Sequence, residues 1–108
     1  MTKIRLESLP DFSPLEGFRA KLVHTEKMTI AHWTIDAGGE LPTHSHPEEQ
    51  VANVMEGEFE LTVDGETELL SAGDVVVIPS DAPHSGRAIS DCKIIDVWHP
   101  CREDYKNK

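Results

Sequence analysis

The stretch that decides the fold is QVANVMEGEFELTVDGETELL, residues 50–70. Phe59, Leu61 and Val63 alternate with polar residues, which gives a strand one apolar and one polar face. The dipeptide Asp-Gly at 64–65 follows, and it is typical of a two-residue hairpin because a type I′ turn needs positive φ at both positions. The stretch therefore predicts two antiparallel strands.

Other short apolar runs bounded by turn residues also predict strands. Residues 18–36 contain two such runs, residues 71–84 predict a turn followed by a buried strand, and CKIIDVWH at 92–99 predicts another strand. No segment has the periodicity of an amphipathic helix, although the tail from residue 100 could form a helical turn. The 108 residues fit one all-β domain, 1–108, built as a sandwich or small barrel.

The composition limits the partners. The formal net charge is −10, so the chain repels nucleic acid and anionic membranes, and an anionic substrate needs a local metal or arginine. The start, MTKIRLESLPDF, has no apolar run, and no segment approaches the length of a membrane span. We expect a cytoplasmic protein in which Cys92 and Cys101 are free thiols.

Histidines form the first candidate site. In PTHSHPEEQ, residues 42–50, His44 and His46 have the spacing that puts both side chains on one face of a strand. Gln50 offers a carbonyl oxygen, and His84 follows the strand predicted near residue 78. Neutral imidazole is a common ligand of divalent metals, but two histidines at this spacing could equally be solvated surface residues.

The wider spacing resembles the two motifs of the cupin superfamily, at about 38–57 and 73–88. The first motif has Gly38, His44, His46, Gln50 and Gly57, and the second has Gly73, Pro79, Asp81, His84 and Ala88. Three positions depart from the family pattern: Gln50 replaces Glu, Asp81 replaces Gly and Ala88 replaces Asn.

This resemblance implies a single cupin-type β-barrel or jelly roll of antiparallel strands. It also implies one divalent transition metal, Zn, Ni, Mn, Fe, Co or Cu, held by His44, His46, Gln50 and His84. A neutral ligand set leaves the metal its full +2 charge, which favours an anionic ligand.

The C-terminal stretch IIDVWHPCREDY, residues 94–105, resembles the small KdgF-type cupins of pectin and alginate breakdown, as does HSHPEEQ. That resemblance implies that the protein opens 4,5-unsaturated uronates to the linear 5-keto form, with a metal as Lewis acid. Asp96 and Arg102 are then catalytic, Asp96 as general base and Arg102 as the partner of the substrate carboxylate. Trp98 packs against the sugar ring.

Two other functions stay open at this point. Three histidines on a redox-active metal suit a dioxygenase, and the fold also serves non-catalytic modules that bind sugar acids or metal. The resemblance further implies a homodimer, for which we expect Ala31, Trp33 and Ile35 to provide an outward apolar patch. The remaining histidines, His24, His32 and His99, are expected to lie outside the site.

Overall fold

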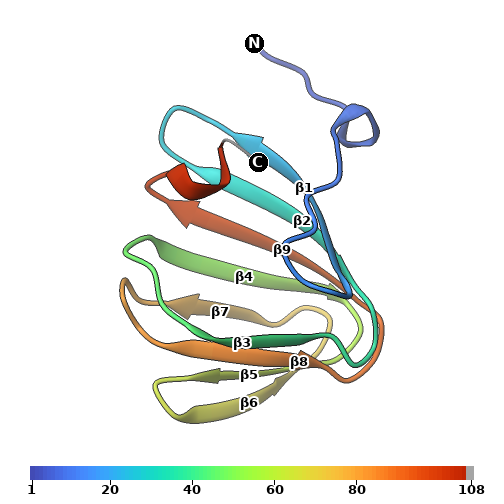
Figure 1. Cartoon of the computed structure of the whole chain (residues 1–108), viewed down its shortest axis with the longest axis vertical. Helices are drawn as coiled ribbons and strands as arrows, with labels where there is room; N and C mark the ends of the chain where they lie inside the picture. The colour runs from blue at the N-terminus through green and yellow to red at the C-terminus, as the bar shows by residue number, and fades with distance from the viewer. Residues whose placement is uncertain (107–108) are drawn as a thin grey trace.

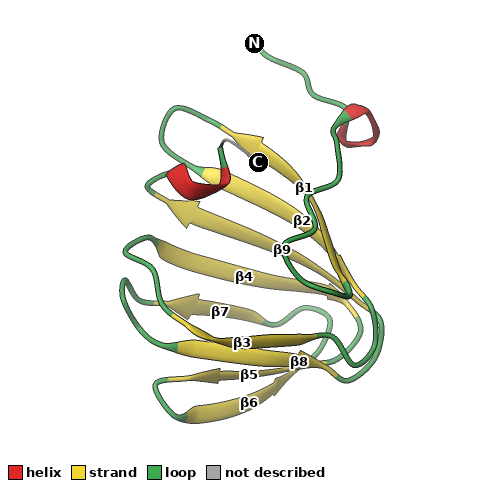
Figure 2. Cartoon of the chain, in the orientation of Figure 1, coloured by secondary structure: helices red, strands yellow, loops and turns green. Residues whose placement is uncertain are grey.

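The computed structural model describes residues 1–106, which are mostly antiparallel strands joined by turns (Figure 2). Its two short 3-10 helices are η1 (Leu6–Ser8) and η2 (Glu103–Tyr105). The strands are β1 (Phe18–His24), β2 (Thr29–Ile35), β3 (Glu40–His44), β4 (Glu49–Glu56), β5 (Phe59–Val63), β6 (Glu66–Leu70), β7 (Val75–Ile78), β8 (His84–Ala88) and β9 (Cys92–His99). The all-β prediction is confirmed, and within residues 100–106 the tail forms a single helical turn.

The strands form two sheets that face each other (Figure 1). The five-stranded sheet has the order β1-β2-β9-β4-β7, and the four-stranded sheet has the order β3-β8-β5-β6. Apart from the hairpins β1–β2 and β5–β6, strands that pair are not consecutive in sequence, which is the arrangement of a jelly roll. Among the described strands, the two sheets are hydrogen-bonded separately and do not close into one continuous barrel.

The hairpin of β5 and β6 forms where the sequence predicts it. Val63 pairs with Glu66, and the turn between them has φ of 49° at Asp64 and 82° at Gly65. Both values are positive, as a type I′ turn requires. Phe59 and Leu61 are buried, so the apolar face of β5 points into the core.

The predicted orientation of β2 is wrong. Ala31, Trp33 and Ile35 are all buried and point between the sheets, not outward. Pairing explains this, because Ala31 lies beside Asp96 of β9 and must share its inward face. In a strand with apolar residues on both faces, the period of two does not say which face is buried.

β7 also differs from the prediction of a buried strand. Among the described strands it pairs with β4 alone, at the edge of the five-stranded sheet. Val75 and Val77 are each 58% exposed, whereas Ile78 is buried. A run of β-branched residues predicts a strand but cannot distinguish an edge from the centre of a sheet.

The free thiols are as expected, since Cys92 and Cys101 are both buried and unbridged. Within residues 1–106 there is no helix whose length and hydropathy would allow it to span a bilayer.

Candidate metal centre and substrate pocket

Three histidines converge between the sheets. His44 and His84 are paired neighbours on β3 and β8, and His46 follows two residues after the end of β3. Each offers a ring nitrogen, and these three atoms lie within 4.8 Å of one another. His46 and His84 are buried and His44 is partly buried. The three histidines are therefore positioned to bind a metal ion.

The rings are oriented by the backbone. In each histidine Nδ1 lies near a carbonyl oxygen two residues away: 3.1 Å from Pro42 O for His44, 3.0 Å from Glu48 O for His46, and 2.9 Å from Ala82 O for His84. A carbonyl oxygen only accepts, so Nδ1 carries the proton in all three rings. The second nitrogen, Nε2, then presents a lone pair, as metal-binding histidines require.

Gln50 extends this set. Its Oε1 lies 3.1 Å from His46 Nε2 and accepts a hydrogen bond from Trp98 Nε1 at 2.9 Å. The Trp98 bond identifies this atom as the amide oxygen, so two acceptors face each other across 3.1 Å. A shared cation resolves the repulsion between two such lone pairs. His84 Nε2 is also buried without a hydrogen-bond partner among the described residues.

His46 and His84 are held neutral. Burial lowers the pKa of His84 from 6.5 to about 4. Burial also lowers the pKa of His46, and the neighbouring Arg102 guanidinium lowers it further. Neutral imidazole is the form that binds metal, so the residues present fit a divalent transition metal.

Asp96 lies on the inward face of β9 together with Trp98, since residues two apart on a strand share a face. Burial raises its pKa from 3.8 to about 6, although hydrogen bonds from Gln50 and Trp33 oppose the rise. Its Oδ1 is buried and accepts no hydrogen bond within the described part of the chain. A buried carboxylate with a free oxygen and a pKa near 6 is suited to accept a proton.

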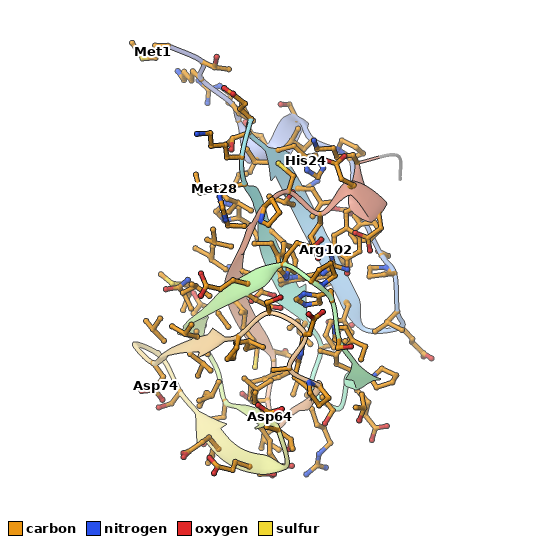
Figure 3. All side chains as sticks on the ribbon, turned by 90° about the vertical axis from the view of Figure 1, so that its left-hand side faces the viewer. Met1, His24, Met28, Asp64, Asp74 and Arg102 are labelled. Atoms are coloured by element: carbon orange, nitrogen blue, oxygen red, sulfur yellow. The ribbon has the colours of Figure 1, made fainter. Side chains whose placement is uncertain are left out.

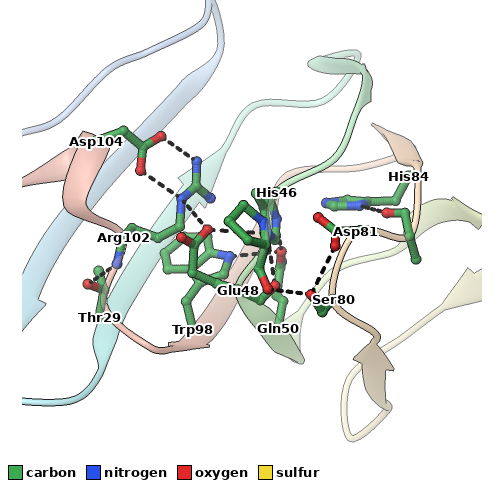
Figure 4. A network of polar contacts seen from close by, with 12 residues as sticks. Thr29, His46, Glu48, Gln50, Ser80, Asp81, His84, Trp98, Arg102 and Asp104 are labelled. Atoms are coloured by element: carbon green, nitrogen blue, oxygen red, sulfur yellow. Dashed lines mark hydrogen bonds and ion pairs between the residues drawn. The ribbon is translucent and has the colours of Figure 1, made fainter.

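Arg102 is buried and enclosed on several sides (Figures 3 and 4). Its Nε and Nη2 donate to Asp104 at 3.0 and 2.9 Å, and Nε lies 3.4 Å from Glu48 Oε1. Its guanidinium carbon lies 3.9 Å from the centre of the Tyr105 ring and 5.0 Å from that of Trp98. Asp104 thus accepts hydrogen bonds from two nitrogens of the guanidinium that the sequence interpretation assigns to the substrate carboxylate. The third nitrogen, Nη1, has no protein partner among residues 1–106.

Three residues of this site were missed from the sequence: Glu48, Asp104 and Tyr105. Glu48 is buried, and its Oε1 lies 3.6 Å from His46 Nδ1 as well as 3.4 Å from Arg102 Nε. The Glu48 carboxylate therefore lies between a histidine of the cluster and the arginine. Nothing in its spacing distinguishes it from Glu49 next to it, because both read as solvated acids after Pro47.

The other histidines lie outside the cluster, as expected. His24 is at the end of β1, with Nδ1 3.0 Å from Thr29 Oγ1. His32 and His99 point away from the core, and His99 is exposed.

A cavity of about 310 Å³ opens at this site and continues between the sheets. One end is lined by polar groups, from His44, Gln50, His84, Asp96, Arg102 and Tyr105. The rest of the lining is almost entirely apolar. This apolar part includes Phe18, Ile35, Val54, Phe59, Leu70 and Ile94. This volume is in the range of small-molecule sites, about 300–1,000 Å³.

Comparison with known proteins agrees with this fold and site. A cupin domain matches residues 31–98. An RmlC-like cupin from Shewanella frigidimarina superposes with a TM-score of 0.86 at 29% identity, over 92% of this chain and 90% of that one. KdgF from Halomonas sp. superposes with a TM-score of 0.88 at 27% identity, over 96% of this chain and 97% of that one.

Oxalate decarboxylase OxdC from Bacillus subtilis shares the fold alone, with a TM-score of 0.82 at 20% identity over 96% of this chain and 30% of that one. No curated protein sequence matches the chain significantly. The cupin domain covers well over half of the chain, its two sheets have the same fold as these structures, and its histidines converge. The chain belongs to the cupin family.

Proposed function

We propose that this protein is a metal-dependent enzyme that opens 4,5-unsaturated uronates to the linear 5-keto form in the breakdown of pectin or alginate. The observation that carries the proposal is a set of three buried atoms without protein partners, His84 Nε2, Asp96 Oδ1 and Arg102 Nη1. All three residues line one cavity, and they supply a metal ligand, a base and a cation. The similarity to KdgF from Halomonas sp. supports the choice of substrate.

A divalent transition metal held by His44, His46, Gln50 and His84 would supply a Lewis acid that stabilises negative charge on oxygen. The four neutral ligands are compatible with Zn, Ni, Mn, Fe, Co or Cu. Trp98 orients Gln50 through its indole N–H, and the backbone carbonyls of Pro42, Glu48 and Ala82 orient the histidines.

Asp96 moves the proton. Its carboxylate takes the proton of the anomeric hydroxyl, the bond from the anomeric carbon to the ring oxygen breaks, and a carbonyl forms at that carbon. The ring oxygen becomes the oxygen of an enolate. Return of the proton from Asp96 to carbon 4 then gives the 5-keto product. The reaction is an isomerisation and needs no oxidant or co-reactant.

Arg102 binds the substrate carboxylate. Its Nε and Nη2 are engaged by Asp104, so the first contact with substrate is a single hydrogen bond from Nη1. The ring of Trp98 lines the cavity beside it and packs against the sugar.

The test is turnover of 4,5-unsaturated galacturonate, with the product identified by nuclear magnetic resonance. Asp96→Asn and Arg102→Ala should each lower kcat/KM by at least about tenfold, since each removes a charged contact of about 1.5–3 kcal/mol. Asp64→Asn, in the exposed turn of the β5–β6 hairpin, is the matched control and should retain full activity. Unchanged turnover in the Asp96 and Arg102 variants refutes the proposal, and oxygen consumption in the wild type would favour a dioxygenase instead.

We also propose that the protein is a cytoplasmic homodimer that pairs through the outer face of the five-stranded sheet. One row of paired residues across that face is wholly apolar: Val23, Ile30, Val97, Val51 and Val77. The corresponding face of the other sheet carries polar residues such as Glu60, Thr62 and Arg87. An apolar row on a chain with a net charge of −10 favours a second copy that covers it.

A further inference from the structure

The cavity has two chemically different ends, and a sugar acid uses only one of them. The pairing registers give the order of the rows that line it. Gln50 pairs with Trp98 at the polar end, and two residues further along the strands Ala52 pairs with Asp96. The next inward pair is Val54 with Ile94, which is four residues, about 13 Å, from the first. Both of these side chains are apolar.

The opposite sheet changes in the same direction. His84 pairs with Val63 at the polar end, Gly86 with Leu61 in the middle, and Ala88 with Phe59 at the deep end. Leu70 pairs with Phe59 from the other side. The two sheets therefore enclose an apolar chamber below the metal ligands, which we define by Val54, Phe59, Leu70 and Ile94.

The lining of this chamber favours an apolar occupant. The whole cavity, of which the chamber is one end, has a volume of about 310 Å³, within the range of small-molecule sites. Protein interiors keep few voids larger than one water molecule, and an apolar void destabilises the fold in proportion to its volume. Water would find no hydrogen-bond partners among these side chains, whereas an apolar group would gain contacts with all of them.

We infer that the site also binds carboxylates that carry an apolar tail of several carbon atoms, with the carboxylate at Arg102 and the metal and the tail in the chamber. Nη1 of Arg102, buried and without a protein partner, lines the same cavity as Val54 and Ile94. An unsaturated uronate has hydroxyl groups on its ring, so it would occupy the polar end and leave the chamber unfilled. The inference thus concerns a second class of ligand and rests on the proposed function only for the anion-binding end.

The experiment is an isothermal titration calorimetry series in which the metal-loaded protein is titrated with acetate, butanoate, hexanoate and octanoate. Each methylene that enters the chamber should tighten Kd about fourfold, and so about fifteenfold between butanoate and hexanoate. Hexylammonium, which has the tail but the opposite charge, should bind far more weakly than hexanoate because it meets the metal and Arg102. A Kd that is independent of chain length, or equal binding of hexylammonium, overturns the inference.

Two variants locate the tail. Val54→Phe fills the chamber and should weaken octanoate about tenfold or more while it leaves acetate within about twofold. Met55→Phe, on the opposite face of the same strand and exposed, is the matched control and should change neither. Equal effects of the two variants on octanoate contradict the inference. If Val54→Phe does not fold, the chain-length series on the wild type remains decisive.

The outcome is separable from that of the proposed function. If the uronate is not turned over but Kd still falls with chain length, the ring-opening proposal fails and the chamber stands. If uronate turnover is found but binding is independent of chain length, the ring-opening proposal stands and the chamber inference fails.

Discussion

Arg102 and Asp104 form a two-point ion pair at the mouth of the site, in which Nε and Nη2 donate to the two carboxylate oxygens at 3.0 and 2.9 Å. Arg102 is buried, whereas the Asp104 side chain is 60% exposed. Of the two carboxylates beside Arg102, Asp104 is therefore the one that solvent or an anionic ligand can more readily replace (Figure 4).

Removal of this competitor should improve anion binding. In Asp104→Asn the fork of Arg102 becomes available for two hydrogen bonds to a ligand carboxylate, while Glu48 and the Tyr105 ring still hold it. We expect Kd for galacturonate, measured by calorimetry, to fall about threefold to tenfold. Because the pair is exposed on one side, unfolding free energy should change by less than about 1 kcal/mol. Glu103→Gln makes the same charge change one residue away and should leave Kd unaltered; weaker binding in Asp104→Asn would contradict this reading.

Asp96 should make the metal-free protein less stable at neutral pH. Its folded pKa of about 6 lies above the ordinary value of 3.8, so between these values the folded state binds more protons than the unfolded state. Stability therefore falls as pH rises from about 4 to 6, and the ionised buried carboxylate costs about 3 kcal/mol above that window.

Asp96→Asn removes this cost. Urea unfolding of the metal-free proteins should find the variant more stable than the wild type by about 2–3 kcal/mol at pH 7.5 and nearly equal at pH 4. Asp64→Asn, at an exposed turn, should give no such pH-dependent difference. The same stability gap for Asp96→Asn at both pH values would rule out a raised pKa at this residue.

Metal binding should stabilise the fold through the three histidines. A ligand present at 100 times its Kd adds about 2.7 kcal/mol to unfolding free energy, so a chelator should lower Tm of the wild type by several degrees. His84→Gln should contain little metal by elemental analysis, and its Tm should not respond to chelator. His99→Gln, an exposed histidine on the same domain, should behave like the wild type. Full metal content in His84→Gln would exclude the proposed ligand set.

The proposed homodimer would pair through the outer face of the five-stranded sheet. Val51 lies at the middle of the apolar row, paired with Val77 on one side and Val97 on the other. Val51→Glu would bury one charge per chain in the interface, which should prevent dimerisation. Light scattering should then give the mass of one chain for the variant and of two chains for the wild type. Thr62→Glu adds the same charge to the outer face of the other sheet and should remain dimeric. A monomeric wild type would refute the proposal.

Local pattern was sufficient for much of the fold. The hairpin turn at Asp64-Gly65 depends only on the positive φ angles that these two residues readily adopt. The shared face of Asp96 and Trp98 follows from the alternation of side chains along a strand. Convergence of His44, His46 and His84 was expected because two motifs at family spacing imply one site, and the structure bears it out.

What the sequence could not predict depends on pairing between distant strands. The inward direction of Ala31, Trp33 and Ile35 is set by register with β9, not by their own pattern. The roles of Glu48 and Asp104 arise because both approach Arg102, and neither residue differs in type or local spacing from its solvated neighbours. The apolar chamber likewise exists only where the inward faces of two sheets meet.

The most direct test of the central claim is the loss of ultraviolet absorbance of 4,5-unsaturated galacturonate, measured against the uncatalysed rate. Metal-loaded wild type should accelerate the loss, and both chelator-treated wild type and metal-loaded Asp96→Asn should return it close to the uncatalysed rate. If metal-loaded wild type gives no acceleration, the protein does not open this ring and the claim is wrong.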